Sequence, residues 1–504
     1  MKQLSKSKYA KYCQCPKALW MSAYKTEEEV IDPATEARFE KGTEVGELAK
    51  GLLGDYVDVT TRKEDGRLDI AAMLRKTQEQ VEAGADNICE AAFSKDGNYC
   101  AVDILHRTEK GYAIYEVKST SFPEFNGQPA KLEKYCPDIA YQKWVLEQCG
   151  INVTGTFLVC LNSDYVRGKE LDIEKLFVIN DMGEMIENEY AKVATLQAEA
   201  KKLLQQEEEP EQDIWEGCKK PYDCGFFKYC SRHIPSPSVF DLYRMKFSDK
   251  LKYYYDGKIT YEDIKDDKLI PVRRIQVDSA LSNQPHIETE KIKEFLDTIT
   301  YPIYFLDFES MQDAVPQYEG TKVYQQVCFQ YSLHIIEKEG GELLHREHLG
   351  ISGKDPRRAL AEQLCEDIPM GACTLVYNKT FECTRMKEMA SWFPDLAEHL
   401  LDINKNIIDL LVPFQKGNYY LPSMGGSFSI KRVLPSLFPD DPSLDYHNLE
   451  GGVQNGTEAM NIFPKIQYMA SEEQRKTRKA LLDYCCLDTF AMVKVWEKLK
   501  EATQ

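Results

Sequence analysis

Acidic residues interrupt apolar strands at two places in the sequence, and this pattern restricts the possible fold more than any other feature. One place is Asp103, followed by Glu116-Val117-Lys118. The other is Asp307-Phe308-Glu309, which directly follows the apolar run Ile303-Tyr304-Phe305-Leu306. Successive side chains of a strand alternate between its faces, so Glu116 and Lys118 share one face, and so do Asp307 and Glu309. Buried carboxylates are costly unless a cation neutralises them, so both places predict metal sites in an α/β fold.

The length of 504 residues and the hydrophobic content of 43% are typical of a globular protein with about two to four domains. No apolar run approaches the ~18 residues of a membrane span, and no apolar signal core follows the N-terminus. A membrane partner is therefore not expected. The 16 cysteines, without a signal for export, predict a reducing, cytoplasmic location.

The formal net charge of −19 argues against a chain that coats nucleic acid by bulk electrostatics. It does not exclude a nucleic-acid enzyme, because carboxylates that hold metal count as negative until the metal binds. Lysines such as Lys6 and Lys8 precede the first acidic residue, Glu27. A solvated helix face explains these lysines as readily as a phosphate-binding track does.

Three segments are expected: a first α/β domain over residues 1–234, a connector over 235–298 and a second α/β domain over 299–504. The boundary follows from Pro-Ser-Pro-Ser at 235–238. The first domain is expected to contain helices over 5–24, 34–53, 137–149 and 192–208, and strands over 87–93, 99–106, 111–117 and 154–161. The second is expected to contain strands over 302–309, 323–336, 343–349 and 373–377, and helices from about 381 and 472.

In the first domain, adjacent strands can bring Asp103 next to Glu116. Two carboxylates bind a hard cation such as Mg²⁺ or Mn²⁺, and the Lys118 ammonium can orient water or steady a charged intermediate. Glu90 adds an acid one strand earlier, and Gln142 begins a helix after the Glu116 strand. Taken alone, an exposed strand pair with a salt bridge explains this pattern at least as well.

Cysteines at regular spacing close the first domain: Cys218, Cys224 and Cys230. Together with a remote cysteine, Cys13 or Cys15, they suit an iron–sulfur (4Fe–4S) cluster that joins both ends of the domain. Four thiolates also suit Zn²⁺, and buried free thiols are the remaining interpretation.

In the second domain, Asn378 and Glu382 follow a strand, while Tyr484 and Asp488 lie four residues apart on one helix face. Asp488 can complete a metal site with Asp307 and Glu309, and the Tyr484 hydroxyl can orient an attacking water. This layout predicts two-metal, in-line attack on a phosphodiester. The alternative is a pair of acids at a strand end that reach solvent.

The stretch Tyr12 to Trp20, with Asp103, Glu116-Val117-Lys118, Gln142 and the cysteine triplet, resembles RecB-like PD-(D/E)XK nucleases, especially CRISPR-associated members with an iron–sulfur cluster. This resemblance covers about residues 1–232 and implies a restriction-endonuclease-like fold. It also implies catalytic roles for the matching residues, and Cys15 rather than Cys13 as the remote cluster ligand. Many relatives carry a metal-binding histidine in a context like Gly42 to Glu47. No histidine occurs there in this sequence, so Glu90 is the candidate substitute.

The second set resembles the DEDDy branch of DnaQ-like 3′–5′ exonucleases, which implies an RNase H-like fold. Asp307 and Glu309 match the first motif, Glu382 the second, and Tyr484 with Asp488 the third. The family usually has Asp at the position of Glu382, so Asp409 is an alternative ligand. The segment Gly425 to Arg432 offers hydroxyls and cations to phosphates, although taken alone it is better explained as a solvated loop.

The complete motif order is similar to a bacterial family known only as a domain of unknown function (number 2779), which joins both nuclease types. The expected function is a metal-dependent nuclease with two centres that acts on ends of single-stranded DNA. The resemblances imply opposite cleavage polarities at the two centres. The alternatives are a nucleic-acid-binding scaffold with one or both centres inactive, and an exoribonuclease.

Overall fold

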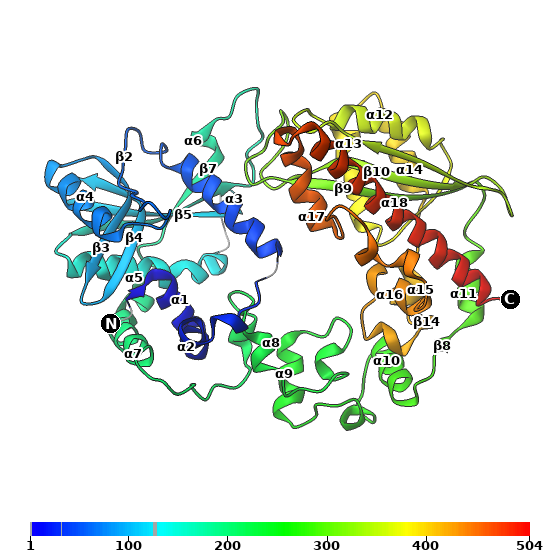
Figure 1. Ribbon diagram of the computed structural model, residues 1–504, viewed down its shortest axis with the longest axis horizontal. Coiled ribbons are helices and arrows are strands. Elements are labelled where there is room, and N and C mark those ends of the chain that lie inside the picture. Colours follow the sequence, from blue (N-terminus) through cyan, green and yellow to red (C-terminus); the bar gives the residue numbers. More distant parts are fainter. Residues whose placement is uncertain (1–2, 32, 124–128) are drawn as a thin grey trace. The chain divides into compact units, whose positions relative to one another are not determined.

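Two units, each built around its own sheet, make up the computed structural model, which describes residues 3–31, 33–123 and 129–504 (Figure 1). Unit 1 comprises residues 1–233 and 313–324, and unit 2 comprises 234–312 and 325–504. Both units combine open mixed sheets with helices, so the predicted α/β class is confirmed. Within the described residues, no helix combines the length and hydropathy that crossing a membrane requires.

Unit 1 contains a central sheet whose strands follow sequence order from β2 to β7, with the short β1 pairing with β4. Its strands are β1 (Leu4–Ser5), β2 (Val57–Asp58), β3 (Asn87–Lys95), β4 (Asn98–Thr108), β5 (Gly111–Phe122), β6 (Val153–Asn162) and β7 (Phe177–Asp181). Strands β3, β4 and β5 are antiparallel neighbours, whereas β6 runs parallel to β5. The parallel pair requires a crossover, which α5 (Cys136–Gln148) supplies.

Helices cover both faces of this sheet. Helices α1 (Lys6–Gln14), α5 and α7 (Glu187–Leu203) contribute to the larger core, which contains Tyr9, Tyr141 and Val193. Helices α3 (Pro33–Ala49) and α6 (Ile173–Leu176) contribute to a second core with Ile104 and Val159. The remaining helices of the unit are α2 (Pro16–Tyr24), α4 (Ile70–Ala83) and α8 (Phe227–Cys230).

Some helix boundaries predicted for unit 1 were wrong in detail, and the helix expected over 34–53 ends at Ala49. The expected helix over 5–24 is interrupted at Cys15, which is extended with φ −162° and ψ 115° because Pro16 disfavours helical backbone in the residue before it. The helix expected over 192–208 ends at Leu203, before the glutamate run. Donors from α2 take the carbonyls there: Trp20 donates to Gln206 at 2.9 Å and Tyr24 to Leu204 at 2.8 Å.

Unit 2 is built on a five-stranded sheet in the order β11-β10-β9-β12-β13. Its strands are β9 (Ile303–Gln312), β10 (Gln326–Ile336), β11 (Leu343–Leu349), β12 (Cys373–Val376) and β13 (Ile407–Asp409). The first three strands are antiparallel, and β12 and β13 run parallel to β9. This order places β9, the strand that carries the acidic pair, at the centre of the sheet.

Opposite faces of β9 contact different helices. Leu306 and Phe308 belong to the core with α12 (Arg357–Asp367), α13 (Thr380–Trp392) and α14 (Ala397–Lys405). Phe305 points the other way and meets Trp496 of α18 (Ser471–Glu501), with ring centroids 5.9 Å apart. In Figure 1 the red α18 lies along β9 and β10. Asp307 and Glu309 have the same parity as Phe305 and therefore lie on the α18 face.

The segment expected as a connector contains α9 (Phe247–Tyr255), α10 (Pro271–Ser282) and α11 (Thr289–Leu296) and belongs to unit 2. It has a small core of its own that includes Val239, Tyr261 and Val277. Strand β8 (His286–Ile287) pairs with β14 (Tyr419–Tyr420) and ties the segment to the later chain. The later helices are α15 (Val412–Gln415), α16 (Ile430–Leu437) and α17 (Gly456–Ile462).

Candidate metal centres

Three acidic residues converge in unit 2. Asp307 and Glu309 come from β9 and Asp488 from α18, and one carboxylate oxygen of each lies within 4.8 Å of the others. Glu309 is 7% exposed and Asp488 8% exposed. The strand alternation and the helix face predicted from the sequence thus bring these side chains to one buried point.

The electrostatics of this acidic cluster are unfavourable without a cation. Burial raises the pKa of Asp307 well above its usual value, and the neighbouring Asp488 raises it further. Burial, followed by Asp488, raises the pKa of Glu309 to about 8. The pKa of Asp488 is also raised by burial, although a hydrogen bond from Tyr446 and the charge of Lys431 oppose the shift. The chain therefore holds carboxylates together without enough positive charge to balance them.

Two residues that were not predicted for this site contact it. Tyr446 donates a 2.6 Å hydrogen bond to Oδ1 of Asp488. Lys431 donates to the hydroxyl oxygen of Tyr484 at 3.1 Å and to the carbonyl of Gln454, also at 3.1 Å. Lys431 belongs to the segment that was expected to contact phosphates or solvent. Tyr446 begins a short 3₁₀ turn, Tyr446–Asn448, whose sequence has no periodicity that could have revealed it.

Glu382 and Asp409 have different surroundings. Glu382, in the first turn of α13, is 3% exposed, and burial raises its pKa to about 8. Its Oε2 has no hydrogen-bond partner among the described residues. The Asp409 carboxylate instead accepts backbone N–H groups of Asn378, Lys379 and Leu411 at 2.9, 3.1 and 3.0 Å. Asp409 thus holds the backbone that leads into α13, while Glu382 remains unsatisfied.

In unit 1, Glu116 is surrounded by cations. It is 1% exposed, and its carboxylate accepts from Lys6 at 2.8 and 2.9 Å and from Gln142 at 2.8 Å. Nζ of Lys118 lies 2.7 Å from Oε1 of Glu116 and 3.0 Å from Oδ2 of Asp138. Burial alone would raise the pKa of Glu116, but Lys118 and Lys6 outweigh it and lower the pKa to about 2. Glu116 is therefore ionised and already neutralised by the protein.

Asp103 and Glu90 lie near this ion-pair network. Oδ2 of Asp103 accepts the backbone N–H of Val117 at 2.6 Å, just beyond the last paired residues of β4 and β5, Ile104 and Tyr115. Burial and then Glu116 raise the pKa of Asp103 to about 6. Burial and then Asp103 raise the pKa of Glu90 to about 7. Within the described part of the chain, Glu90, Asp103 and Glu116 do not form a group with ligand oxygens within 4.8 Å of one another.

Cysteines from both ends of unit 1 meet. Cys15, Cys224 and Cys230 pack in one cluster with Trp20 and Phe226. Burial, together with the neighbouring Cys224, Cys15 and Cys230, raises the pKa of Cys218 to about 11, so all four thiols lie near one another. Gln14 fixes the contact by donating to the carbonyls of Gly217 and Tyr222, both at 2.8 Å. Cys13 packs instead against the main core of the unit.

Comparisons with known proteins match only part of the chain. Residues 304–429 match the profile of the family described as "Domain of unknown function (DUF2779)". The chain is 28% identical over 178 residues to "Uncharacterized protein UU173" of Ureaplasma parvum, which is 33% of this chain and 25% of that protein. It is 28% identical over 213 residues to "Uncharacterized protein MG366 homolog" of Mycoplasma pneumoniae, 38% of this chain and 31% of that protein. No solved structure matches.

The matches thus span a quarter to about a third of each of these relatives. The DUF2779 region begins inside β9 and ends just before α16, so it includes Asp307, Glu309 and Glu382 but not Tyr484 or Asp488. These comparisons therefore show that part of unit 2 is similar to a family of unknown function, and they assign no chemistry to it.

Proposed function

We propose that the protein is a divalent-metal-dependent nuclease and that its main centre is the acidic cluster of Asp307, Glu309 and Asp488. The observation that carries the proposal is the convergence of these buried carboxylates within 4.8 Å, with raised pKa values. Folding such a cluster is unfavourable unless a ligand compensates for it, and the clustering of perturbed groups is typical of functional sites. The central strand and packed helix also suit an RNase H-like exonuclease fold.

The donor set fits Mg²⁺ or Mn²⁺, because both prefer carboxylate oxygens to nitrogen or sulfur. Such ions, when bound, stabilise charge on a phosphodiester and make water a better nucleophile. Glu382 is the proposed additional ligand, since its Oε2 is unsatisfied, whereas Asp409 is engaged by backbone amides.

Residues around the cluster have distinct proposed roles. Lys431 donates to the Tyr484 oxygen, so the Tyr484 hydroxyl proton points away from Lys431. A hydrogen bond from Tyr484 also lowers the pKa of Asp488, so this hydroxyl is proposed to orient a water at that carboxylate. Burial and the charge of Asp488 raise the pKa of Tyr484 well above its usual value, which keeps that proton in place. The Tyr446 hydrogen bond orients the Asp488 carboxylate. Tyr484 is thus the proposed catalytic residue that orients water.

Asp103, Glu116, Lys118 and Gln142 form the proposed second centre, of the PD-(D/E)XK type. Glu116 would bind a cation only after Lys6 leaves it, because Lys6 donates to both carboxylate oxygens. Once released, Lys6 and Lys118 are both near enough to bind a phosphate. Asp103, with a pKa of about 6, lies near Glu116, and Glu90, with a pKa of about 7, lies near Asp103; both are proposed as further ligands.

A 4Fe–4S cluster held by Cys15, Cys218, Cys224 and Cys230 is the proposed structural cofactor. The meeting of these four thiols, Cys15 from the start of the unit and the other three from residues 218–230, supports it. A single tetrahedral zinc ion with ~2.3 Å bonds needs sulfurs about 3.8 Å apart. Among the described residues no three of these thiols fall within 4.8 Å of one another, which favours a larger cluster over zinc. Such a cluster would join the α1–α2 break to residues 218–230.

Single-stranded DNA is the proposed substrate, because a flexible strand enters buried sites more easily than a stacked duplex. The test is digestion of single strands labelled at the 5′ or the 3′ end, with Mn²⁺, Mg²⁺ or EDTA, by wild type, Asp307→Asn and Lys118→Ala. Each variant is expected to lose one labelled product series and to keep the other. Intact strands with wild-type protein and either metal would refute the nuclease proposal. Competition with labelled RNA distinguishes a deoxyribonuclease from an exoribonuclease.

A nucleic-acid-binding scaffold is the second candidate for unit 1, and the Lys6–Glu116 ion pair favours it because it fills the position of a metal. In that case Lys118→Ala leaves all cleavage unchanged, while Asp307→Asn abolishes it. Unchanged cleavage in both variants would exclude both proposed centres.

A further inference from the structure

His334, His345 and Cys486 form a second cluster of metal-ligating side chains in unit 2, separate from the acidic cluster. One candidate ligand atom of each, a ring nitrogen or the sulfur, lies within 4.8 Å of the other two. His334 and His345 face each other as a pair on β10 and β11, and Cys486 comes from α18. Nitrogen and sulfur donors from three elements thus meet at one point, whereas the acidic cluster offers only oxygen.

Hydroxyl groups determine which nitrogen of each ring is free. The Thr489 hydroxyl donates to the carbonyl of Cys486 at 3.1 Å, so its oxygen accepts from Nδ1 of His334 at 2.8 Å and from Ser332 at 2.7 Å. Ser332 has then used its proton, and its oxygen accepts from Nε2 of His345 at 3.0 Å. This assignment satisfies every donor in the network. It leaves the lone pairs of His334 Nε2 and His345 Nδ1 free for a metal.

Such outer hydrogen bonds are a common feature of metal-binding histidines, because they fix the tautomer and the orientation of the ring. The ring centroids lie 4.6 Å apart at an interplanar angle of 38°, so the rings are tilted rather than stacked. Packing of the two rings alone would not require the buried hydroxyls of Ser332 and Thr489, which are hydrogen-bonded to each other and to the rings.

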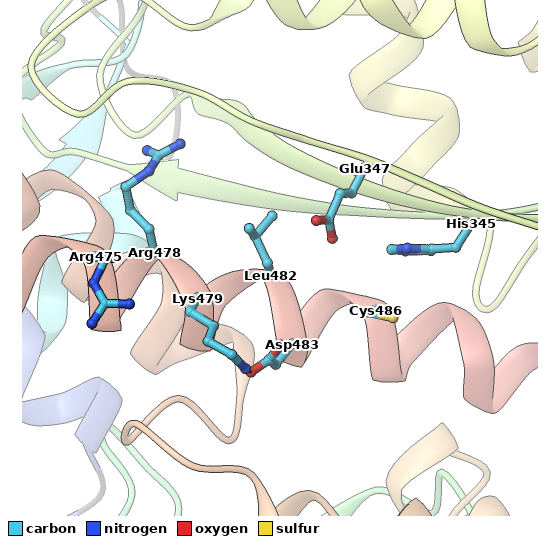
Figure 2. Close-up of a pocket in the computed structure, with 8 residues that line it drawn as sticks. All are labelled: His345, Glu347, Arg475, Arg478, Lys479, Leu482, Asp483 and Cys486. Carbon is cyan, nitrogen blue, oxygen red and sulfur yellow. The ribbon is translucent and has the colours of Figure 1, made fainter.

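The cluster is open to solvent on one side. His345 and Cys486 line a pocket of about 470 Å³, together with residues of α18 that include Arg475, Arg478 and Lys479. Figure 2 shows His345 and Cys486 at the same end of this pocket, with the cationic side chains toward the other end. An ion can therefore reach the cluster from solvent, and a position beside it remains for water or an anion.

We infer that His334, His345 and Cys486 bind one ion of the zinc class. Imidazole and thiolate suit Zn²⁺, whereas Mg²⁺ and Ca²⁺ prefer oxygen. On binding, the Cys486 thiol releases its proton to solvent and a sulfur–metal bond forms, while both histidines bind as neutral rings. The ion clamps β10, β11 and α18, the helix that carries Tyr484 and Asp488. This inference does not depend on nuclease activity.

The test is the zinc content of the full-length protein, stripped of metal and then titrated in excess Mg²⁺, which occupies oxygen sites. Wild type is expected to bind one more equivalent of Zn²⁺ than His345→Ala or Cys486→Ser. With Co²⁺ as the probe, the Cys486→Ser spectrum should lack the part of the thiolate charge-transfer band that this sulfur contributes. Ser332→Ala should weaken zinc binding by about 10- to 100-fold, because it removes an outer hydrogen bond.

His348→Gln is the matched control. His348 lies on β11, as His345 does, but on the opposite face of that strand. There it stacks on Tyr331, with ring centroids 5.8 Å apart, so this variant should bind as many zinc ions as wild type. His345 is exposed and its replacement should preserve folding, which circular dichroism checks. Equal zinc stoichiometry and affinity in wild type, His345→Ala and Cys486→Ser would overturn the inference. Because no nucleic acid is present, this result stands apart from the outcome of the nuclease assay.

Discussion

Nζ of Lys6 lies 2.8 Å from Oε1 and 2.9 Å from Oε2 of Glu116, although the two residues are 110 positions apart. A helix at the N-terminus thus places a cation on the carboxylate of β5. The cluster of Asp307, Glu309 and Asp488 has no such built-in neutralisation, and the pKa values of its members are raised instead. The two proposed centres therefore differ in what a metal ion must displace: an ammonium at one and protons at the other.

Replacement of Lys6 should make the centre of unit 1 bind metal more readily. In an Asp307→Asn background, which isolates unit 1, Lys6→Gln removes the competing cation. The half-saturating Mn²⁺ concentration for cleavage should fall by about tenfold, equivalent to ~1.4 kcal/mol. Lys8→Gln is the control, because Lys8 of the same helix donates to a backbone carbonyl, that of Gln3, at 3.1 Å. A higher Mn²⁺ requirement would instead show that Lys6 assists binding.

Neutralising one member of the acidic cluster should stabilise the metal-free protein. Asp307→Asn removes a buried carboxyl group that must hold a proton beside Asp488 and Glu309, so unfolding in EDTA should require on the order of 1 kcal/mol more free energy. The same variant should lose the stabilisation that Mn²⁺ gives to wild type. Thermal melts with and without Mn²⁺ measure both effects. Asp395→Asn, at an exposed ion pair with Arg358, is the control and should show neither effect.

The stability of the metal-free protein should fall as pH rises. The folded pKa values of Glu309 and Glu382 are about 8, compared with 4.5 as the usual value, so the folded state retains protons that the unfolded state releases. Stability therefore decreases with pH between about pH 5 and pH 8. Melts in EDTA across this window should show the decrease, and Mn²⁺ should reduce it because the metal replaces the protons. A pH-independent melting temperature in EDTA would contradict the unbalanced cluster.

The strand alternation was enough to predict that Asp307 and Glu309 share a face, because the period of two is a local property of the backbone. Pro16 marks the helix break at Cys15 in the sequence, but the helical spacing over 5–24 favoured one continuous helix. Lys6 could not be assigned, since a lysine-rich helix looks the same whether it faces solvent or a buried acid. Tyr446 lies in irregular chain and reaches Asp488 only through tertiary packing, so no sequence period marks it. The end of α7 was also not predictable, because it depends on tertiary hydrogen bonds from side chains of α2.

Of the neighbouring Cys13 and Cys15, only Cys15 is expected to bind the iron–sulfur cluster. Cys15→Ser should abolish the brown colour and broad visible absorbance expected of anaerobically purified protein, because Cys15 packs with Cys224 and Cys230. Cys13→Ser should retain both, since Cys13 packs in the other core. Iron and sulfide analysis of the two variants measures how much of each element is bound per protein chain. A colourless wild-type protein that contains zinc would favour Zn²⁺ at these cysteines and leave the nuclease centres unaffected.

The location of Mn²⁺ in crystals of the full-length protein is the most direct test of the proposed main centre. Anomalous scattering at the manganese edge should give a peak about 2.1 Å from carboxylate oxygens of Asp307, Glu309 and Asp488. In crystals of Asp307→Asn the peak should be lost or much weakened. Manganese absent from this cluster in wild-type crystals soaked at saturating concentration would contradict the proposal that these carboxylates form a metal-dependent nuclease centre.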